Sequence, residues 1–65
     1  MKIVLNGKET EVEEAKVLSS LMEDMKLGGP VAAMVNDEVI HREKLGSVRL
    51  KEGDRVELFR MMGGG

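Results

Sequence analysis

The sequence predicts an α+β fold in which a mixed sheet of four or five strands carries one helix across one face. Three observations lead to it: an alternating segment with a tight turn opens the chain, a helical apolar stripe follows, and three apolar segments come after the stripe. The expected order is β-β-α-β-β-β. With 65 residues, we expect one small domain over 1–62 and a flexible glycine tail over 63–65.

A β-hairpin is predicted at the start of the chain. Ile3 and Leu5 are spaced by two, which is the period of a strand. Asn6-Gly7 follows, and this pair is a strong signal for a type I′ turn because both central positions need a positive φ. We therefore expect a second strand that continues through Val12.

A helix is predicted within residues 15–29. Its apolar residues recur at i, i+3, i+4 and i+7, the spacing that places side chains on one face, and they are Leu18, Leu21, Met22 and Met25. This stripe is expected to pack on the sheet.

The ends of this helix carry weaker signals. Glu13 and Glu14 are expected near its positive end and Lys26 near its negative end. Gly28 is expected as the residue that ends the helix, and Pro30 prevents its continuation. No Ser, Thr, Asp or Asn stands just before the stripe, so the helix lacks a hydroxyl or carboxylate N-cap.

The second half of the chain predicts three more strands. Residues 31–40 read as a strand, a tight turn near Asn36 to Glu38 and a short return strand. Residues 41–50 show no clear period and predict a connector with one helical turn. A turn at Gly53-Asp54 then leads into the final strand.

Composition excludes several classes of function. The net charge of −2 argues against a general binder of phosphate backbones, and one Phe without Trp or Tyr argues against base stacking. The absence of cysteine excludes disulfides, thiolate metal sites and cysteine nucleophiles. No apolar run approaches the roughly 18 residues of a membrane span. We expect a cytoplasmic protein that binds neither nucleic acid nor membrane.

The side chains predict no active site. His41 is the only histidine and has no cysteine or second histidine with which to bind a metal. We read it as a loop residue. No catalytic residue and no metal ligand are assigned, and we expect a protein that is not an enzyme.

The tail offers a different kind of chemistry. Gly63, Gly64 and Gly65 lack Cβ atoms, so they could pass through a narrow channel of another protein. A carboxylate on Gly65 would become reactive once ATP converts it to an acyl-adenylate. The alternative interpretation is a frayed end without function.

Taken together, these features resemble the ThiS-type sulfur carriers, which have the ubiquitin-like β-grasp fold. The resemblance covers essentially the whole chain. It rests on the order and spacing of Asn6-Gly7, Leu21-Met22, Val35-Asn36, Arg42, Gly53-Asp54 and Gly64-Gly65. The sequence departs from the family pattern at His41, where proline is common, and in the additional glycine at Gly63.

The resemblance implies a role for the tail. A ThiF-like adenylyltransferase would use ATP to adenylate Gly65, while Gly63 and Gly64 thread the tail into the partner. Sulfur from a persulfide donor would then give a thiocarboxylate, and a thiazole synthase would use it to build the thiazole of thiamine. No bound cofactor is implied, because ATP is used by the partner.

Residues just before the tail are candidates for docking that partner. Alternation places Phe59 and Met61 opposite Val56 and Leu58. Phe59 is therefore either a core residue of a bulged strand or an exposed anchor. We expect Phe59, Met61 and Met62 to dock the activating enzyme, since flexible methionines suit an adaptable surface.

Three alternatives remain open at this point. The chain could be a sulfur carrier of another branch, serving molybdopterin, tRNA thiolation or cysteine synthesis. It could be a ubiquitin-like modifier that forms isopeptide bonds. It could also be a binding module whose tail has no role.

Overall fold

The structure is a computed structural model that describes residues 1–26 and 31–60. Several predictions fall outside the described residues: those on Gly28, Met61, Met62 and the glycines at 63–65. The end of the domain at residue 62 therefore also stays a prediction.

The order of elements confirms the predicted β-β-α-β-β-β arrangement, with a 3-10 helix in the connector. The elements are β1 (Lys2–Leu5), β2 (Lys8–Glu11), α1 (Leu18–Asp24), β3 (Val31–Val35), β4 (Glu38–Ile40), η1 (Arg42–Ser47) and β5 (Arg55–Arg60).

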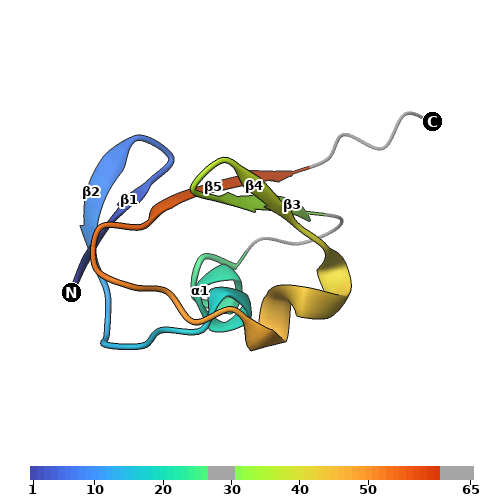
Figure 1. The fold of residues 1–65 in the computed structure, drawn as a ribbon, viewed down its shortest axis with the longest axis horizontal. Helices are drawn as coiled ribbons and strands as arrows, with labels where there is room; N and C mark the ends of the chain where they lie inside the picture. Colours follow the sequence, from blue (N-terminus) through green and yellow to red (C-terminus); the bar gives the residue numbers. More distant parts are fainter. Residues whose placement is uncertain (27–30, 61–65) are drawn as a thin grey trace.

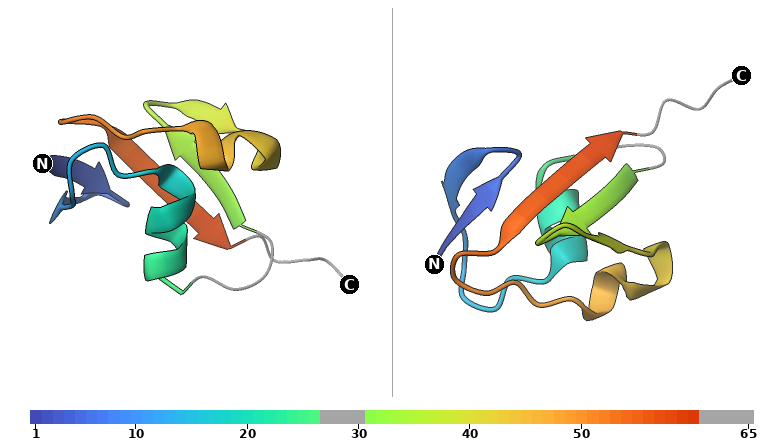
Figure 2. Two further views of the ribbon diagram at one scale, coloured as in Figure 1. Left: turned by 90° about the horizontal axis from the view of Figure 1, so that it is seen from below. Right: turned by 45° about the horizontal axis from the view of Figure 1, so that its top comes forward.

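The strands form one mixed sheet in the order β2-β1-β5-β3-β4. β1 and β5 run parallel, and the other neighbours are antiparallel. Both α1 and η1 lie on one side of this sheet (Figure 1), and the further views show the same arrangement. Within the described residues, the opposite face of the sheet is left uncovered (Figure 2). The molecule therefore has a covered inner face and a bare outer face.

Two hairpins have the turn that their sequences predict. Asn6 and Gly7 have φ values of 49° and 83°, and Asn36 and Asp37 have values of 51° and 69°. Two consecutive positive φ values define the type I′ turn, whose twist matches that of the flanking strands. Both predicted turns are confirmed.

The start of α1 confirms that a side-chain cap is absent. Val17 is the N-cap and makes no side-chain hydrogen bond. The connector after η1 replaces the cap, because the backbone N–H of Leu18 donates to the carbonyl of Val48 at 2.9 Å. One more hydrogen bond, from the N–H of Leu50 to the carbonyl of Lys16 at 2.8 Å, holds the connector beside the helix.

The end of α1 differs from the prediction. The helix ends at Asp24, and Lys26 takes the left-handed conformation with a φ of 56°. Its N–H donates to the carbonyl of Glu23 at 3.0 Å, so Lys26 fills the role that was predicted for Gly28. Glu13 and Glu14 lie ahead of the helix, whose first turn holds no acidic residue, whereas Lys26 directly follows the C-cap residue Met25 at the negative end, although the last turn itself holds no basic residue.

The core lies between α1 and the inner face of the sheet. Its buried apolar residues come from β1, α1, β3, β5 and the connector after η1, and they are Ile3, Leu18, Leu21, Ala33, Leu50, Val56 and Leu58. The predicted helical stripe is confirmed at three positions, because Leu18 and Leu21 are buried and Met22 packs against them. Met25, the fourth, is 36% exposed.

Candidate functional site

The strand that leads to the glycine tail occupies the centre of the sheet. β5 pairs with β1 on one side, where Leu5 lies opposite Val56, and with β3 on the other, from Val35↔Val56 to Val31↔Arg60. The tail glycines lie outside the described residues. The strand that precedes them pairs with β1 at Arg55 and Val56 and with β3 from Val56 to Arg60.

Two asparagine side chains also bind the backbone of β5. Asn6 Oδ1 accepts from the N–H of Leu58 at 2.9 Å, and Asn36 Oδ1 accepts from the N–H of Arg55 at 2.9 Å. Each asparagine therefore forms a turn and also supplies a hydrogen-bond partner to β5. Sequence reasoning identified only the turns, because it gave no sign of which distant strand each amide would meet.

Asp54 completes the entry into β5. Its side chain is buried, with 6% exposed, and it is the one buried polar or charged residue of the described chain. Its carboxylate accepts from the Nδ2 of Asn36 at 3.1 Å and from the backbone N–H of Lys51 at 2.8 Å. Burial of this carboxylate is tolerated because hydrogen bonds satisfy both of its oxygens.

Phe59 lies on the outer face of the sheet. Its side chain is 43% exposed, and its strand pairs with β3 in an unbroken register in which Ala32 lies opposite Phe59. Because no residue is skipped, β5 has no bulge that could turn Phe59 inward. The interpretation of Phe59 as exposed is confirmed, and the interpretation as a core residue is wrong.

Phe59 belongs to an apolar surface that we call the outer patch. It comprises Ala32, Met34, Val39 and Phe59 from the three neighbouring strands β3, β4 and β5. Met34 lies opposite Val39 across β3 and β4. Val39 is 60% exposed, whereas Ala32 and Met34 are half-buried. Contiguous exposed apolar residues on one sheet face are typical of protein-binding surfaces.

Charged side chains border the outer patch, and one of them, Glu57, lies within it opposite Met34. Arg55 Nη2 and Asp37 Oδ2 are 2.8 Å apart, and both side chains are more than half exposed. Arg60 follows Phe59 and is exposed, but the alternation of β5 places it on the other face of the strand. Exposed ion pairs contribute little to stability, so these groups are free to contribute to partner recognition.

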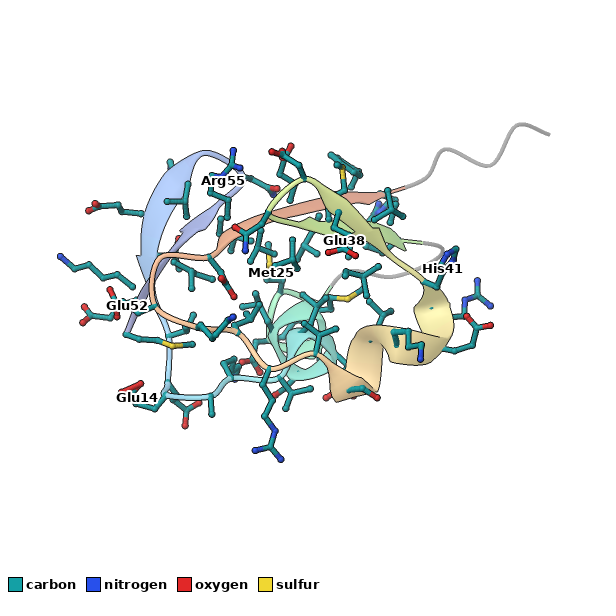
Figure 3. The ribbon with its side chains drawn as sticks, viewed as in Figure 1. Glu14, Met25, Glu38, His41, Glu52 and Arg55 are labelled. Carbon is teal, nitrogen blue, oxygen red and sulfur yellow. The ribbon has the colours of Figure 1, made fainter. Side chains whose placement is uncertain are left out.

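A candidate metal site is absent from the described residues. Residues 1–26 and 31–60 hold no group of three or more His, Cys, Asp or Glu side chains that could bind a metal. His41 precedes η1 and is exposed, well away from Arg55 (Figure 3). Over the same residues, none of the helices has the length and apolar character needed to cross a membrane.

Comparison with known proteins places the chain in a family. The model of the ThiS family matches residues 3–65, a span that includes the three terminal glycines. A search of curated proteins found no match.

Two solved structures from Geobacter metallireducens resemble this one. The crystal structure of a thiamine biosynthesis protein (ThiS) superposes with a TM-score of 0.85, at 33% identity and full coverage of both chains. The solution structure of a thiamine biosynthesis protein gives a TM-score of 0.79 at 33% identity, covering 100% of this chain and 88% of that one. The chain therefore belongs to the ThiS family and has its β-grasp fold, and this membership supports a role as a sulfur carrier.

Proposed function

We propose that this protein carries sulfur as a thiocarboxylate on Gly65 and delivers it to the thiazole of thiamine. The observation that carries the proposal is the family match, which spans the fold and the three glycines together. The similar crystal structure is that of a thiamine biosynthesis protein, which favours the thiamine branch over other sulfur carriers.

The proposed chemistry has three steps. First, the carboxylate of Gly65 attacks the α-phosphate of ATP, which forms an acyl-adenylate and releases pyrophosphate. Second, the terminal sulfur of a persulfide attacks the acyl carbon and displaces AMP. A thiol then reduces the remaining sulfur–sulfur bond, which leaves the thiocarboxylate and a disulfide. Because this chain contains no cysteine, the persulfide and the thiol both belong to partners.

The protein acts in this scheme as a co-substrate. A ThiF-like adenylyltransferase binds ATP, and a thiazole synthase takes the sulfur. The chain itself binds no cofactor and supplies the acyl group, with Gly63 and Gly64 threading the tail into each partner. The use of ATP suggests that the protein works in the cytoplasm.

The outer patch is the proposed docking surface for the adenylyltransferase. Phe59 is exposed and lies one residue before the end of β5. A partner seated on Phe59 would therefore meet the chain just before the tail enters its active site. Met61 and Met62 follow in sequence and are proposed to extend the same contact.

Intact-protein mass spectrometry tests the proposal. The protein is incubated with ATP, the cognate adenylyltransferase and a sulfur source, and we expect the mass gain that replaces one oxygen by sulfur. The six methionines are a complication, because oxidation of one adds nearly the same mass. The absence of cysteine solves it: a thiol-alkylating reagent should label only the thiocarboxylate.

Variants separate the competing functions. Deleting Gly64 and Gly65 together should abolish alkylation, and fragmentation of the labelled protein should place the label on Gly65. Isopeptide conjugates in cells without a free thiocarboxylate would instead indicate a protein modifier. An unlabelled protein in the presence of a verified active adenylyltransferase would overturn the sulfur-carrier proposal.

A further inference from the structure

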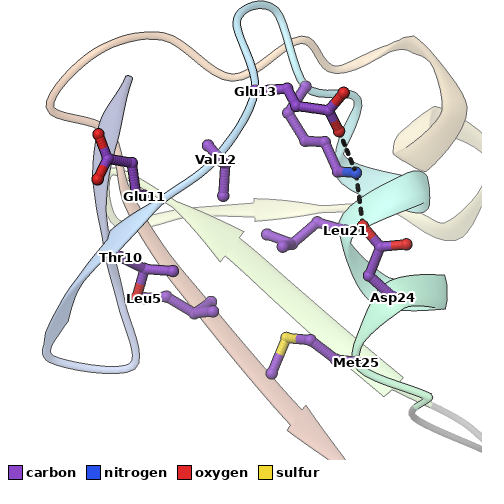
Figure 4. Close-up of a pocket in the computed structure, with 9 residues that line it drawn as sticks. Leu5, Thr10, Glu11, Val12, Glu13, Leu21, Asp24 and Met25 are labelled. Carbon is purple, nitrogen blue, oxygen red and sulfur yellow. Dashed lines mark hydrogen bonds and ion pairs between the residues drawn. The ribbon is translucent and has the colours of Figure 1, made fainter.

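A groove of about 470 Å³ lies between the β1-β2 hairpin and α1, on the inner side of the sheet. Apolar side chains line it from both elements, and these are Leu5, Val12, Leu21 and Met25. Figure 4 shows the hairpin and the helix facing each other across this opening. Met25 reaches from the end of α1 toward the sheet (Figures 3 and 4). Its side chain remains partly exposed because it lines this open groove.

One wall of the groove is an open strand edge. β2 is the outermost strand and pairs only with β1 in the described sheet. Alternate pairs of the β1-β2 ladder are Ile3↔Thr10 and Leu5↔Lys8. Met1 and Val12 form the next pair of this series and exchange two backbone hydrogen bonds, at 2.8 and 2.9 Å. In an antiparallel ladder the pairs between these make no hydrogen bonds to each other.

The intervening residues of β2 therefore direct their backbone groups away from β1. These residues are Glu9 and Glu11, which lie opposite Val4 and Lys2. Their N–H and C=O groups can accept an additional strand, because an exposed edge is a template for pairing. The edge is short, and its charged side chains protect it against indiscriminate pairing.

The charged residues around the groove determine which kind of peptide could add to the sheet beside β2. Its lining residues include the acidic Glu11, Glu13 and Asp24 and the basic Lys16. Lys16 Nζ already pairs with Asp24 at 2.5 Å and with Glu13 at 3.4 Å (Figure 4). Along the β2 edge, the exposed side chains of Glu9 and Glu11 are negative and that of Lys8 is positive, which leaves the edge acidic by one charge. The groove and its edge are therefore apolar inside and acidic outside.

We propose that the edge of β2 and this groove bind an extended peptide in which apolar residues alternate with lysine or arginine. The peptide adds to the sheet as a strand beside β2. Successive side chains of a strand point to opposite faces, so the apolar ones enter the groove. The basic ones then lie beside Glu9 and Glu11, where opposite charges on adjacent strands stabilise the pairing.

This surface is separate from the outer patch. The groove lies against α1, whereas Phe59 and Val39 are on the uncovered face of the sheet. A carrier bound to an enzyme through the outer patch would thus keep the β2 edge available for a second partner. Peptide binding needs neither ATP nor Gly65, so the test below can fail without affecting the proposed sulfur chemistry.

The test uses the isolated full-length protein and a defined probe. The probe is the acetylated and amidated peptide Lys-Val-Lys-Ile-Lys-Val-Lys, titrated into isotope-labelled protein and followed by NMR. We expect the amide signals of Glu9, Glu11 and Met25 to shift, and amide hydrogen exchange at Glu9 and Glu11 to slow. A peptide with glutamate in place of every lysine should bind at least about tenfold more weakly, a difference that one favourable charge-assisted contact can supply.

Two matched variants distinguish strand addition from charge attraction. Glu11→Gln removes the charge and keeps the N–H, whereas Glu11→Pro also removes an N–H that the β1 ladder does not use. We expect Glu11→Pro to bind more weakly than Glu11→Gln. N-methylation of alternate peptide amides makes the same comparison on an unaltered protein, in case the proline variant does not fold.

Phe59→Ala serves as the control and should bind the probe like the wild type. Equal binding of the basic and acidic peptides would overturn the assigned charge preference. The peptide is N-methylated at one alternate set of amides and, in a second version, at the other set. If both versions bind as tightly as the unmethylated peptide, strand addition is overturned. Shifts confined to Val39 and Phe59, or no shifts at millimolar peptide, would overturn the site.

Discussion

The side-chain oxygen of Asn6 accepts a hydrogen bond at 2.9 Å from the backbone N–H of Leu58, 52 positions later in the chain. This contact extends the β1-β5 pairing past the point where β1 turns back into β2. It therefore connects the first hairpin to the strand that leads to the glycine tail.

Replacing Asn6 by glycine should isolate the contribution of this contact. Glycine keeps the positive φ of the turn but removes the acceptor, leaving a partly buried N–H without its partner. We expect a loss of about 1–3 kcal/mol in the free energy of unfolding, measured by urea denaturation, and faster hydrogen exchange at Leu58. Asn6→Asp keeps an acceptor and tolerates the turn, so it should lose less. Equal losses in the two variants would contradict the role of the hydrogen bond.

Leu50→Ala should be among the most damaging single substitutions. Leu50 lies in the connector outside the strands and helices, yet it is 2% exposed and belongs to the core. Truncating a buried leucine costs about 2–5 kcal/mol, which is a large part of the stability of a small domain. Denaturation curves would measure this, with the half-buried Leu45→Ala as the control. Similar losses at both positions would contradict the core assignment.

Phe59→Ala should affect activation more than folding. The side chain is 43% exposed, so the free energy of unfolding should change by less than about 1 kcal/mol. Loss of an aromatic anchor at an interface commonly costs more than about 1 kcal/mol, so kcat/KM for adenylation should fall on the order of tenfold. Met25→Ala removes a partly exposed side chain on the other side of the sheet and should leave adenylation unchanged. Normal adenylation of a folded Phe59→Ala protein would exclude this docking surface.

Lys16 predicts a dependence of stability on alkaline pH. Its hydrogen bond to Asp24 is the main cause that raises the pKa of Lys16 above its ordinary value of 10.5; burial opposes this effect and Glu13 reinforces it. Because the folded state holds the proton more tightly, the stabilisation is complete below 10.5 and is lost as the pH rises through the raised pKa.

Thermal unfolding of the wild type and Lys16→Met at several pH values would measure this effect. The difference between the two proteins should be constant near neutral pH and shrink above 10.5. Lys44→Met is the matched control, since Lys44 is exposed and belongs to none of the ion pairs of the described residues. A difference that is independent of pH would show that Lys16 acts through packing alone.

The parts of the fold that depend on local chemistry could be predicted from the sequence. Asn6-Gly7 and Asn36-Asp37 form their turns because asparagine, aspartate and glycine tolerate positive φ, and this preference is readable in a few residues. The alternation around Val56 likewise showed which face of β5 is buried. The turns and the alternation predicted the order of the elements. The exposure of Phe59 followed from the same alternation only after the structure showed that β5 pairs with β3 without a bulge.

Features that depend on distant partners could not be predicted in this way. The N-terminal end of α1 is satisfied by Val48, and Leu50 reaches the core from an aperiodic segment. The left-handed end of α1 at Lys26 was also missed, because glycine two positions later was the stronger local signal. The groove beside β2 became visible only when the hairpin and α1 were placed together.

The parallel pairing of β1 with β5 has a mechanical consequence. A partner that pulls on the residues after Arg60 loads β5 along its own axis, across hydrogen bonds that run roughly perpendicular to the pull. Force between the two ends of the chain would therefore shear the β1-β5 ladder as a unit instead of opening it one bond at a time.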